Sequence, residues 1–176
     1  MNKIIYVSVF VLFFMSCKKQ KIGFVNNGTL VNAYAQKIEI DSIFQLKNAA
    51  FKIKTDSIGK AFQLVAKKDQ ADAQKLYKQR KIAKAEALIN SLKQKQQKLQ
   101  QELQIEQQLL TKDFQVQIDT VIVKVKRFVK VYGEAHGFTY ILGTTDATST
   151  VMYGEASINI TKDVLKALNE AYKTEE

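Results

Sequence analysis

The sequence predicts an α+β protein, with a small oligomeric β body and a long antiparallel α-helical coiled-coil hairpin inserted between its strands. Three observations lead to this prediction: the 176 residues include no proline, no glycine lies between Gly59 and Gly133, and apolar residues recur at heptad-like spacing through the middle of the chain. Proline and glycine both disfavour helices, so their absence permits very long ones. We expect the body in residues 17–35 and 137–176, the second part with a terminal helix, and the hairpin in residues 36–136.

The N-terminal segment has the layout of a bacterial lipoprotein signal peptide. An apolar run from Ile4 to Met15 is followed by the small Ser16, by Cys17, which is the chain's only cysteine, and by two lysines. The run is too short to span a bilayer, which needs about 20 apolar residues. We therefore expect residues 1–16 to be removed and Cys17 to be lipidated, so that the protein is held to a membrane in the periplasm. An ordinary signal peptide, or a single-pass anchor with a chance cysteine, is the alternative.

The membrane that carries this anchor is only weakly indicated. No aspartate follows Cys17, and an aspartate next to the lipidated residue is associated with retention at the inner membrane. The sequence therefore favours the outer membrane, without deciding between the two.

Short elements surround the predicted hairpin. Residues 21–26 (KIGFVN) read as a strand that the turn formers of 26–28 close, and a short helix follows over 29–34. After the hairpin, 138–142 (FTYIL) and 150–153 (TVMY) read as strands on either side of a polar loop, and 157–160 alternates apolar and polar residues. A final amphipathic helix is predicted over 162–172, capped by Thr161.

The outgoing helix of the hairpin is predicted from apolar residues three and four positions apart. Its first pattern consists of Ile43, Leu46, Ala50 and Ile53. After a phase shift, Ile58, Ala61, Phe62 and Val65 continue it. The polar residues 67–70 interrupt the pattern, with Asp69 as the expected N-cap of the next helix.

The return helix shows a longer and stricter pattern. Its apolar positions, close to heptad spacing, are Ala85, Leu88, Leu92, Leu99, Leu103, Leu110, Phe114, Ile118, Val121, Val125, Phe128 and Tyr132. Such a seam is typical of helices that wind around a partner helix. The tip is expected within residues 66–84, and an arm of this size would be about 60 Å long. Because the return helix is the longer one, part of it should bend or pack against the body.

Charge is concentrated in the predicted hairpin. Residues 36–136 hold 20 Lys and Arg against 11 Asp and Glu, whereas residues 137–176 hold three against six. The candidate residues for binding a client or another anion are Lys75, Lys78, Arg80, Lys81, Lys84, Lys93, Lys95 and Lys98. A basic stretch attracts nucleic acid, lipid head groups or acidic polypeptides. The signal peptide argues against nucleic acid. Anionic lipid or lipopolysaccharide remains open, as does a solvated helix face with no partner.

The sequence offers little material for catalysis. It has no G-x-S-x-G, C-x-x-C or H-E-x-x-H motif and no P-loop. The single histidine, His136, lies at a predicted helix end, where a cation is favoured, so a capping role is the expectation. We expect no enzyme activity, no cofactor and no metal site.

Several local sequences resemble the Skp (OmpH-like) family of periplasmic chaperones. The matching pieces are KIGFVN at 21–26, FTYILG at 138–143, TVMY at 150–153 and INITKDVL at 158–165. The terminal pieces are fairly specific, whereas the coiled-coil middle is not. The resemblance covers essentially the whole chain after the signal peptide. It implies a homotrimer whose β body carries three helical tentacles around a cavity. It also implies ATP-independent binding of unfolded outer-membrane proteins there, which prevents their aggregation.

Two sets of apolar residues follow from this reading. Side chains with no obvious partner in the hairpin, which could contact a client, are Phe51, Phe62, Leu64, Leu76 and Tyr77; the alternative is that they pack within the hairpin. One chain's few strands cannot make a stable core, so the body should be oligomeric. Its candidate residues are Phe24, Val25, Phe138, Tyr140, Ile141, Val151, Met152 and Tyr153. The competing hypothesis is a structural coiled-coil envelope lipoprotein that binds no client.

Overall fold

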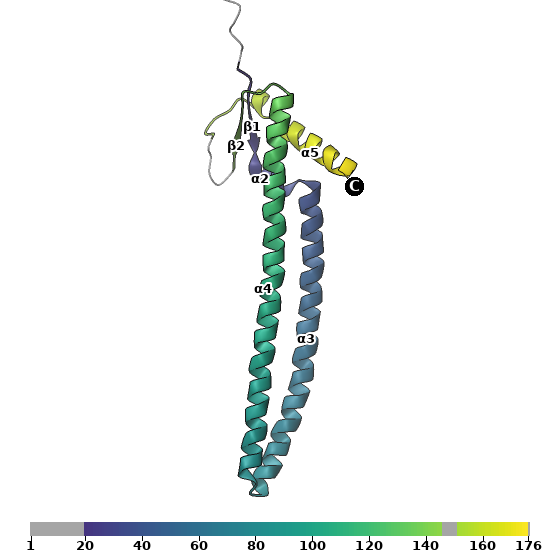
Figure 1. Ribbon diagram of the computed structural model, residues 1–176, viewed down its shortest axis with the longest axis vertical. Helices are drawn as coiled ribbons and strands as arrows, with labels where there is room; N and C mark the ends of the chain where they lie inside the picture. The colour runs from purple at the N-terminus through teal and green to yellow at the C-terminus, as the bar shows by residue number, and fades with distance from the viewer. Residues whose placement is uncertain (1–19, 146–150, 176) are drawn as a thin grey trace, which may run out of the picture. The chain divides into compact units, whose positions relative to one another are not determined.

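The computed structural model describes residues 20–145 and 151–175. The chain forms two compact units (Figure 1): the arm, residues 35–122, and the body, which comprises the described residues on either side of it. The order of elements is β1 (Ile22–Asn26), α2 (Asn27–Asn32), α3 (Ala35–Lys78), α4 (Ile82–Ala135), β2 (Tyr140–Thr144), η2 (Ala156–Ile158) and α5 (Thr161–Glu175). The predicted α+β class, with a helical hairpin inserted between two strands, is therefore confirmed.

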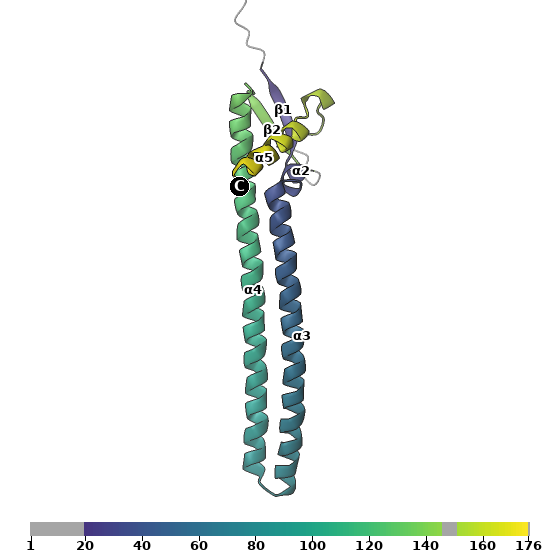
Figure 2. The same ribbon diagram turned by 90° about the vertical axis from the view of Figure 1, so that its right-hand side faces the viewer.

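The arm consists of α3 and the part of α4 up to residue 122, which lie side by side and antiparallel (Figures 1 and 2). Phe44 and Phe114 stack between them with ring centroids 4.0 Å apart. Closer to the turn the contact is made by the buried Ala73, Ala85 and Leu92. The 44 residues of α3 correspond to a length of about 66 Å.

The prediction of a break at residues 67–70 was wrong. Helix α3 continues without interruption to Lys78, so Asp69 lies inside a helix and does not cap one. Lysine and glutamine are good helix formers, and this segment has neither glycine nor proline to stop the helix. The shift in the apolar pattern is a change from the exposed Leu46 and Ile53 to the half-buried Ile58 and Phe62 along one continuous helix.

The helices are joined by a tight turn at Gln79–Lys81 that has the hydrogen bonds of a Schellman motif. The N–H of Arg80 donates to the Tyr77 carbonyl at 2.9 Å, and that of Lys81 donates to the Leu76 carbonyl at 2.9 Å. Arg80 has φ of 59°, in the left-handed region. The C-terminal end of α4 has the same bonding pattern, but there the left-handed position is Gly137, with φ of 68°.

This comparison leads to a stability prediction. Glycine adopts the left-handed region without the steric cost that arginine has there, so Arg80→Gly should stabilise the protein by about 1 kcal/mol. The midpoint of thermal unfolding, followed by circular dichroism, should rise by about 2–4 °C. Gly137→Ala, at the equivalent position of α4, should lower the midpoint of thermal unfolding. A lower midpoint for Arg80→Gly would contradict the assigned turn geometry.

The body is built on two parallel strands. In β1 and β2, Ile22 pairs with Tyr140 and Asn26 with Thr144, and Asn159 bridges to Phe24 on the other side of β1. Strand β1, helices α2, α4 and α5, and the residues next to α2 and α5 all supply buried side chains. The buried apolar residues of the body are Val25, Leu30, Tyr34, Val125, Ile160, Val164 and Leu168. The last turns of α4, from Val123 onward, belong to this unit, which accounts for the greater length of α4.

Polar side chains fix the helix starts of the body. The Asn26 side chain accepts a hydrogen bond from the Thr29 N–H at 2.9 Å and so caps α2. The expected capping by Thr161 takes a different form. Its hydroxyl accepts from the Asn26 N–H and donates to the Asn159 side chain, which also accepts from the Thr161 N–H. Thr161 thus connects β1 to the start of α5, and Asn159 makes the local cap.

The strands after the hairpin differ from their predictions. Strand β2 begins at Tyr140, because Phe138 still completes the end of α4 through its N–H bond to the Gly133 carbonyl. In the described residues 151–153 there is no strand, and Met152 and Tyr153 are 90% and 87% exposed. Strand formation depends on neighbours more than on propensity, and the described part of this chain supplies none here. Residues 157–160 form the end of the short helix η2 and a bridge to β1.

Candidate functional site

The arm exposes large apolar side chains along both of its helices. On α3, Leu46 and Ile53 are 69% and 68% exposed, and on α4, Leu109 is 61% exposed. The other members, Ile43, Leu64, Ile105 and Val116, are also exposed. We call this surface the apolar face. Residues three, four and seven apart share one side of a helix, so each helix contributes a continuous stripe.

Two ion pairs between the helices mark one side of the arm, next to Ile43 and Ala50 of α3 and Leu109 of α4. Lys47 pairs with Asp113 at 2.9 Å, and Lys54 pairs with Glu106 at 2.7 Å. A hollow beside these pairs is lined by Ala50 of α3 and by Leu109 of α4. Ile43 lines a second hollow, which also includes Lys47 and Asp113. The apolar face thus consists of two apolar stripes, one on each helix.

The ion pair with Lys47 favours the charged form of Asp113. Hydrogen bonds from Lys47 and from Gln117, together with the charge of Lys47, lower the pKa of the Asp113 carboxyl below its usual value of 3.8. The stabilisation that the pair contributes is therefore present above the ordinary carboxyl pKa. It is lost only as the pH falls through the lower value of the folded protein.

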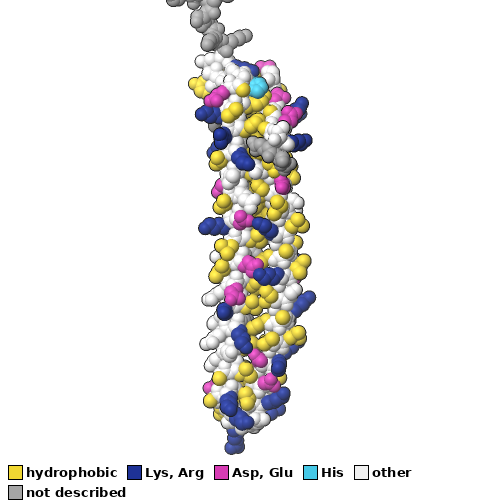
Figure 3. All heavy atoms as spheres, turned by 45° about the vertical axis from the view of Figure 1, so that its right-hand side comes forward, with side chains coloured by type: hydrophobic (Ala, Val, Ile, Leu, Met, Phe, Trp, Pro, Cys, Tyr) yellow, Lys and Arg dark blue, Asp and Glu magenta, His cyan; other side chains and the backbone are white. Residues whose placement is uncertain are grey.

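The opposite side of the arm is polar at the same level. The positions turned away from the ion pairs are Asp41, Gln45, Asn48 and Lys52 on α3, with Gln100, Gln104, Gln107 and Thr111 on α4. The arm therefore has apolar and polar surfaces at the level of residues 41–53 of α3 and 100–116 of α4. Figure 3 shows hydrophobic side chains along the arm, interrupted by charged ones, and Lys and Arg gathered at the turn. A surface of this kind can bind apolar polypeptide, while its charges keep it in water.

The predicted client-contacting residues divide into two groups. Phe51, Phe62 and Leu76 are half-buried, and Phe51 lines the hollow between the helices. Leu64 and Tyr77 are exposed, and Leu64 belongs to the apolar face. Most of this face is not among the predicted client-contacting residues, because the spacing of Ile43, Leu46 and Ile53 was used only to predict a helix. Their three-and-four spacing was the available signal.

The eight predicted basic residues surround the turn and the first half of α4. Two have an acidic partner: Lys75 lies 3.1 Å from Asp72, and Lys98 lies 3.9 Å from Glu102. Lys81 donates to the side chain of Gln79. The other five make no ion pair with the described residues. The turn is therefore a concentrated source of positive potential.

The predicted body residues occupy different environments. Val25 is buried, and Phe24, Phe138, Ile141 and Val151 are half-buried. Exposed members are Tyr140, Met152 and Tyr153. Thus β2 and the segment after it present apolar side chains that the described residues of one chain do not cover.

His136 lies just after the end of α4 and closes it. Its Nδ1 is 2.8 Å from the Tyr132 carbonyl oxygen, and its ring stacks on Tyr132 at 3.9 Å. Lys21 donates to the His136 carbonyl at 3.0 Å and lies over the Phe138 ring. These contacts match the expected capping position. Cys17 and the predicted signal peptide lie outside the described residues.

Neither a candidate membrane-spanning helix nor a candidate metal site is present in the described residues. No helix within residues 20–145 and 151–175 is both long and apolar enough to cross a membrane. In the same residues, no group of three or more His, Cys, Asp or Glu side chains is placed to hold a metal ion.

A long helical hairpin inserted between the two strands of a small body defines the fold class of this protein. A family model described as "Outer membrane protein (OmpH-like)" matches residues 21–168, and the chain belongs to this family, which is the Skp family. The family is periplasmic, binds outer-membrane proteins and oligomerises, so membership implies a periplasmic chaperone of outer-membrane proteins. A search of curated proteins finds no match.

Proposed function

We propose that this chain is an ATP-independent holdase that binds unfolded outer-membrane proteins on the apolar face of its arm and prevents their aggregation. The observation that carries the proposal is the exposure of large apolar side chains along both helices of the hairpin, among them Leu46, Ile53 and Leu109. Isolated exposed apolar residues are ordinary, whereas a contiguous row of them marks an interaction surface. The proposal includes no catalytic step, no cofactor and no metal.

The size of the apolar face suits a segment of an unfolded β-barrel. From residue 43 to residue 64, the stripe on α3 extends for about 32 Å. A transmembrane strand of about 10 residues at about 3.3 Å per residue has the same length, and its apolar residues alternate with polar ones. Such a strand can place its apolar side on the stripe and leave its polar side in water. The contacts depend on no particular sequence, as a chaperone with many clients requires.

Charge should assist the first encounter. The arm holds 16 Lys and Arg against 10 Asp and Glu, so it attracts acidic clients over distances that salt shortens. Light scattering of a diluted, urea-unfolded outer-membrane protein tests the proposal. Aggregation should be suppressed at near-stoichiometric chaperone, and capture should slow as salt is raised. A protein without effect on scattering at any salt concentration would instead fit the structural coiled-coil lipoprotein.

A homotrimer would place three such faces around one cavity. The family oligomerises, and a two-stranded sheet is marginal by itself. The exposed Tyr140, Met152 and Tyr153 of the body supply apolar surface for such an assembly. Three arms facing a common space would surround a client that a single arm could only touch.

The proposal includes a lipid anchor at Cys17, which the signal-like segment supports. Cys17 precedes β1 by only four residues, so the lipid should hold the body beside the membrane. In the trimer, three anchors exceed the two signals that stable attachment needs. Cys17→Ala should move the protein from the membrane fraction into the soluble periplasmic fraction. Retention of this variant in the membrane fraction would rule out the anchor; retention of Cys17→Ala only until a high-salt wash would indicate binding through the basic turn.

Binding of anionic lipid or lipopolysaccharide is a second candidate function. The observation in its favour is the group of cations at the turn, most of which have no acidic partner among the described residues. It would appear as salt-sensitive binding of the Cys17→Ala variant to anionic vesicles and no binding to neutral ones. This activity is compatible with client binding.

A further inference from the structure

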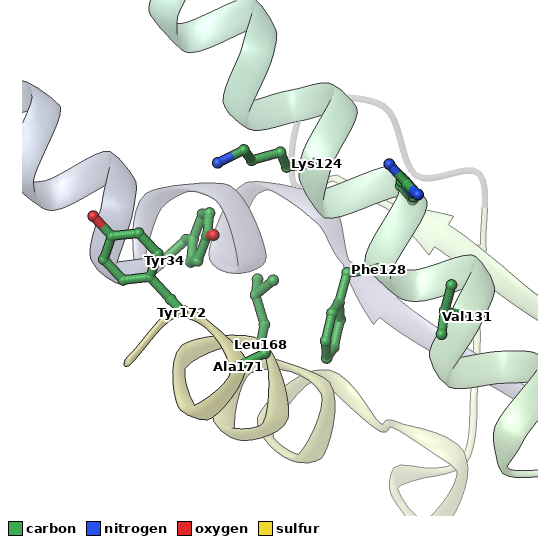
Figure 4. Close-up of a pocket in the computed structure, with 8 residues that line it drawn as sticks. Tyr34, Lys124, Phe128, Val131, Leu168, Ala171 and Tyr172 are labelled. Carbon is green, nitrogen blue, oxygen red and sulfur yellow. The ribbon is translucent and has the colours of Figure 1, made fainter. Parts of the chain in front are cut away.

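The body contains a cavity that the client-binding proposal does not use. It has a volume of about 360 Å³ and lies between the last turns of α4, the end of α2 and the face of α5 (Figure 4). Ligand pockets in proteins have volumes of about 300–1,000 Å³, so a small molecule or a single chain segment fits. All of its lining residues belong to the body, and none belongs to the apolar face of the arm.

The walls of the cavity are apolar and held in place. Leu168 and Tyr34 are each only 3% exposed, so packing fixes the floor. Tyr34 and Tyr172 meet edge to face with centroids 5.6 Å apart, which makes a rigid side wall. Phe128 and Ala171 contribute apolar surface from α4 and α5. Such walls suit a hydrocarbon chain, because the chain is buried by apolar contacts and needs no hydrogen-bond partner.

The rim of the cavity is basic. Lys124 and Arg127, one helical turn apart on α4, line it, and no Asp, Glu or His does so. The one acid of α4 after residue 122, Glu134, lies 3.9 Å from Lys130. The cavity therefore attracts an anionic group at its rim and disfavours a cation.

We propose that this cavity binds a single-chain anionic lipid, with the alkyl chain among Phe128, Leu168 and Tyr172 and the carboxylate or phosphate at Arg127. An alkyl chain has no backbone to satisfy, whereas a peptide would bring N–H and C=O groups into walls made of helices whose own backbone bonds are already paired. Fatty acids and lysophospholipids share the required chemistry. A lipid at this place would link the state of the membrane to the chaperone without involving the arm.

The test is calorimetric titration of the full chain carrying Cys17→Ala with straight-chain carboxylates of increasing length. Each buried methylene should tighten binding about fourfold, until the cavity is full and the affinity levels off. The alcohol of equal length should bind at least about tenfold more weakly, because it lacks the charge. Dodecanoate and dodecyl phosphate, compared at equal chain length, distinguish a fatty-acid site from a phospholipid site.

Three variants locate the binding. Arg127→Gln should weaken dodecanoate binding about tenfold and remove the preference over dodecanol. Lys126→Gln makes the same charge change on the same helix outside this cavity and should have no effect. Ala171→Phe should block the longer chains by filling the cavity, with near-ultraviolet circular dichroism as the check of folding. Equal effects of Arg127→Gln and Lys126→Gln, no dependence on chain length, or displacement of dodecanoate by a tighter-binding peptide would each overturn the proposal. Because aggregation suppression depends on the arm, a failure here leaves the proposed function untouched, and the reverse also holds.

Discussion

Truncation of Leu46, Ile53 and Leu109 together to alanine should weaken the binding of unfolded outer-membrane proteins about 100-fold. Each side chain is more than 60% exposed in the free arm, so its removal costs the fold little. Each truncation should remove about 1 kcal/mol of binding free energy from the complex, roughly half the value for full burial of a large apolar side chain. The three losses amount to about 3 kcal/mol of binding free energy, which corresponds to that factor. Fluorescence titration with a labelled, urea-unfolded client measures it.

A matched control lies on the opposite side of the same two helices. Gln45, Gln104 and Gln107 can be truncated to alanine with similar loss of side-chain length, and alanine retains the helix in both variants. The control should bind clients like the parent protein. If the two triple variants lose affinity equally, or if neither loses any, the apolar face is not the client site.

Placing aspartate at Met152 and Tyr153 should dissociate the oligomer. Both side chains are almost fully exposed in one chain, so the charges should leave the monomer folded. Inside an interface, unpaired carboxylates would be removed from water at a cost of several kcal/mol each. Sedimentation analysis of the chain without residues 1–17 should therefore give a trimer for the parent and a monomer for Met152→Asp/Tyr153→Asp.

Val123 provides the comparison for this experiment. It belongs to the body and is 64% exposed, but it lies on α4 and not in the segment that follows β2. Val123→Asp should remain trimeric. If Met152→Asp/Tyr153→Asp remains a trimer, the subunit interface lies elsewhere. If the parent protein is a monomer, the proposed cavity between three arms does not exist.

The hairpin could be predicted from the sequence because its signals are local. The lack of proline and the long apolar repeat indicate long helices whatever surrounds them. The local sequence does not decide which side of α3 faces α4. Helix α3 has two apolar stripes, one through Phe44, Phe51 and Phe62 and another through Leu46 and Ile53, and both have helical spacing. Only the position of α4 decides that the first is covered and the second is exposed.

The errors in the body arise from interactions that the local sequence does not contain. The TVMY segment at 150–153 has strand composition, but a strand needs a neighbour, and the described part of one chain offers none to residues 151–153. Thr161 looks like a cap for its own helix, and its hydroxyl is instead taken by Asn26, 135 positions away in sequence. The cavity lined by Tyr34, Phe128 and Leu168 joins three parts of the chain that are far apart in sequence, so no short motif indicates it.

Site-specific photocrosslinking tests directly whether clients bind to the apolar face of the arm. A photoreactive phenylalanine analogue is placed at one position at a time, Leu46 or Leu109 on the apolar face and Gln45 or Gln104 on the polar face, and the protein is irradiated with an unfolded outer-membrane protein. Strong adducts are expected from the two leucine positions and weak ones from the two glutamine positions. Equal adducts from all four positions, or stronger ones from the glutamine positions, would contradict client binding at the apolar face.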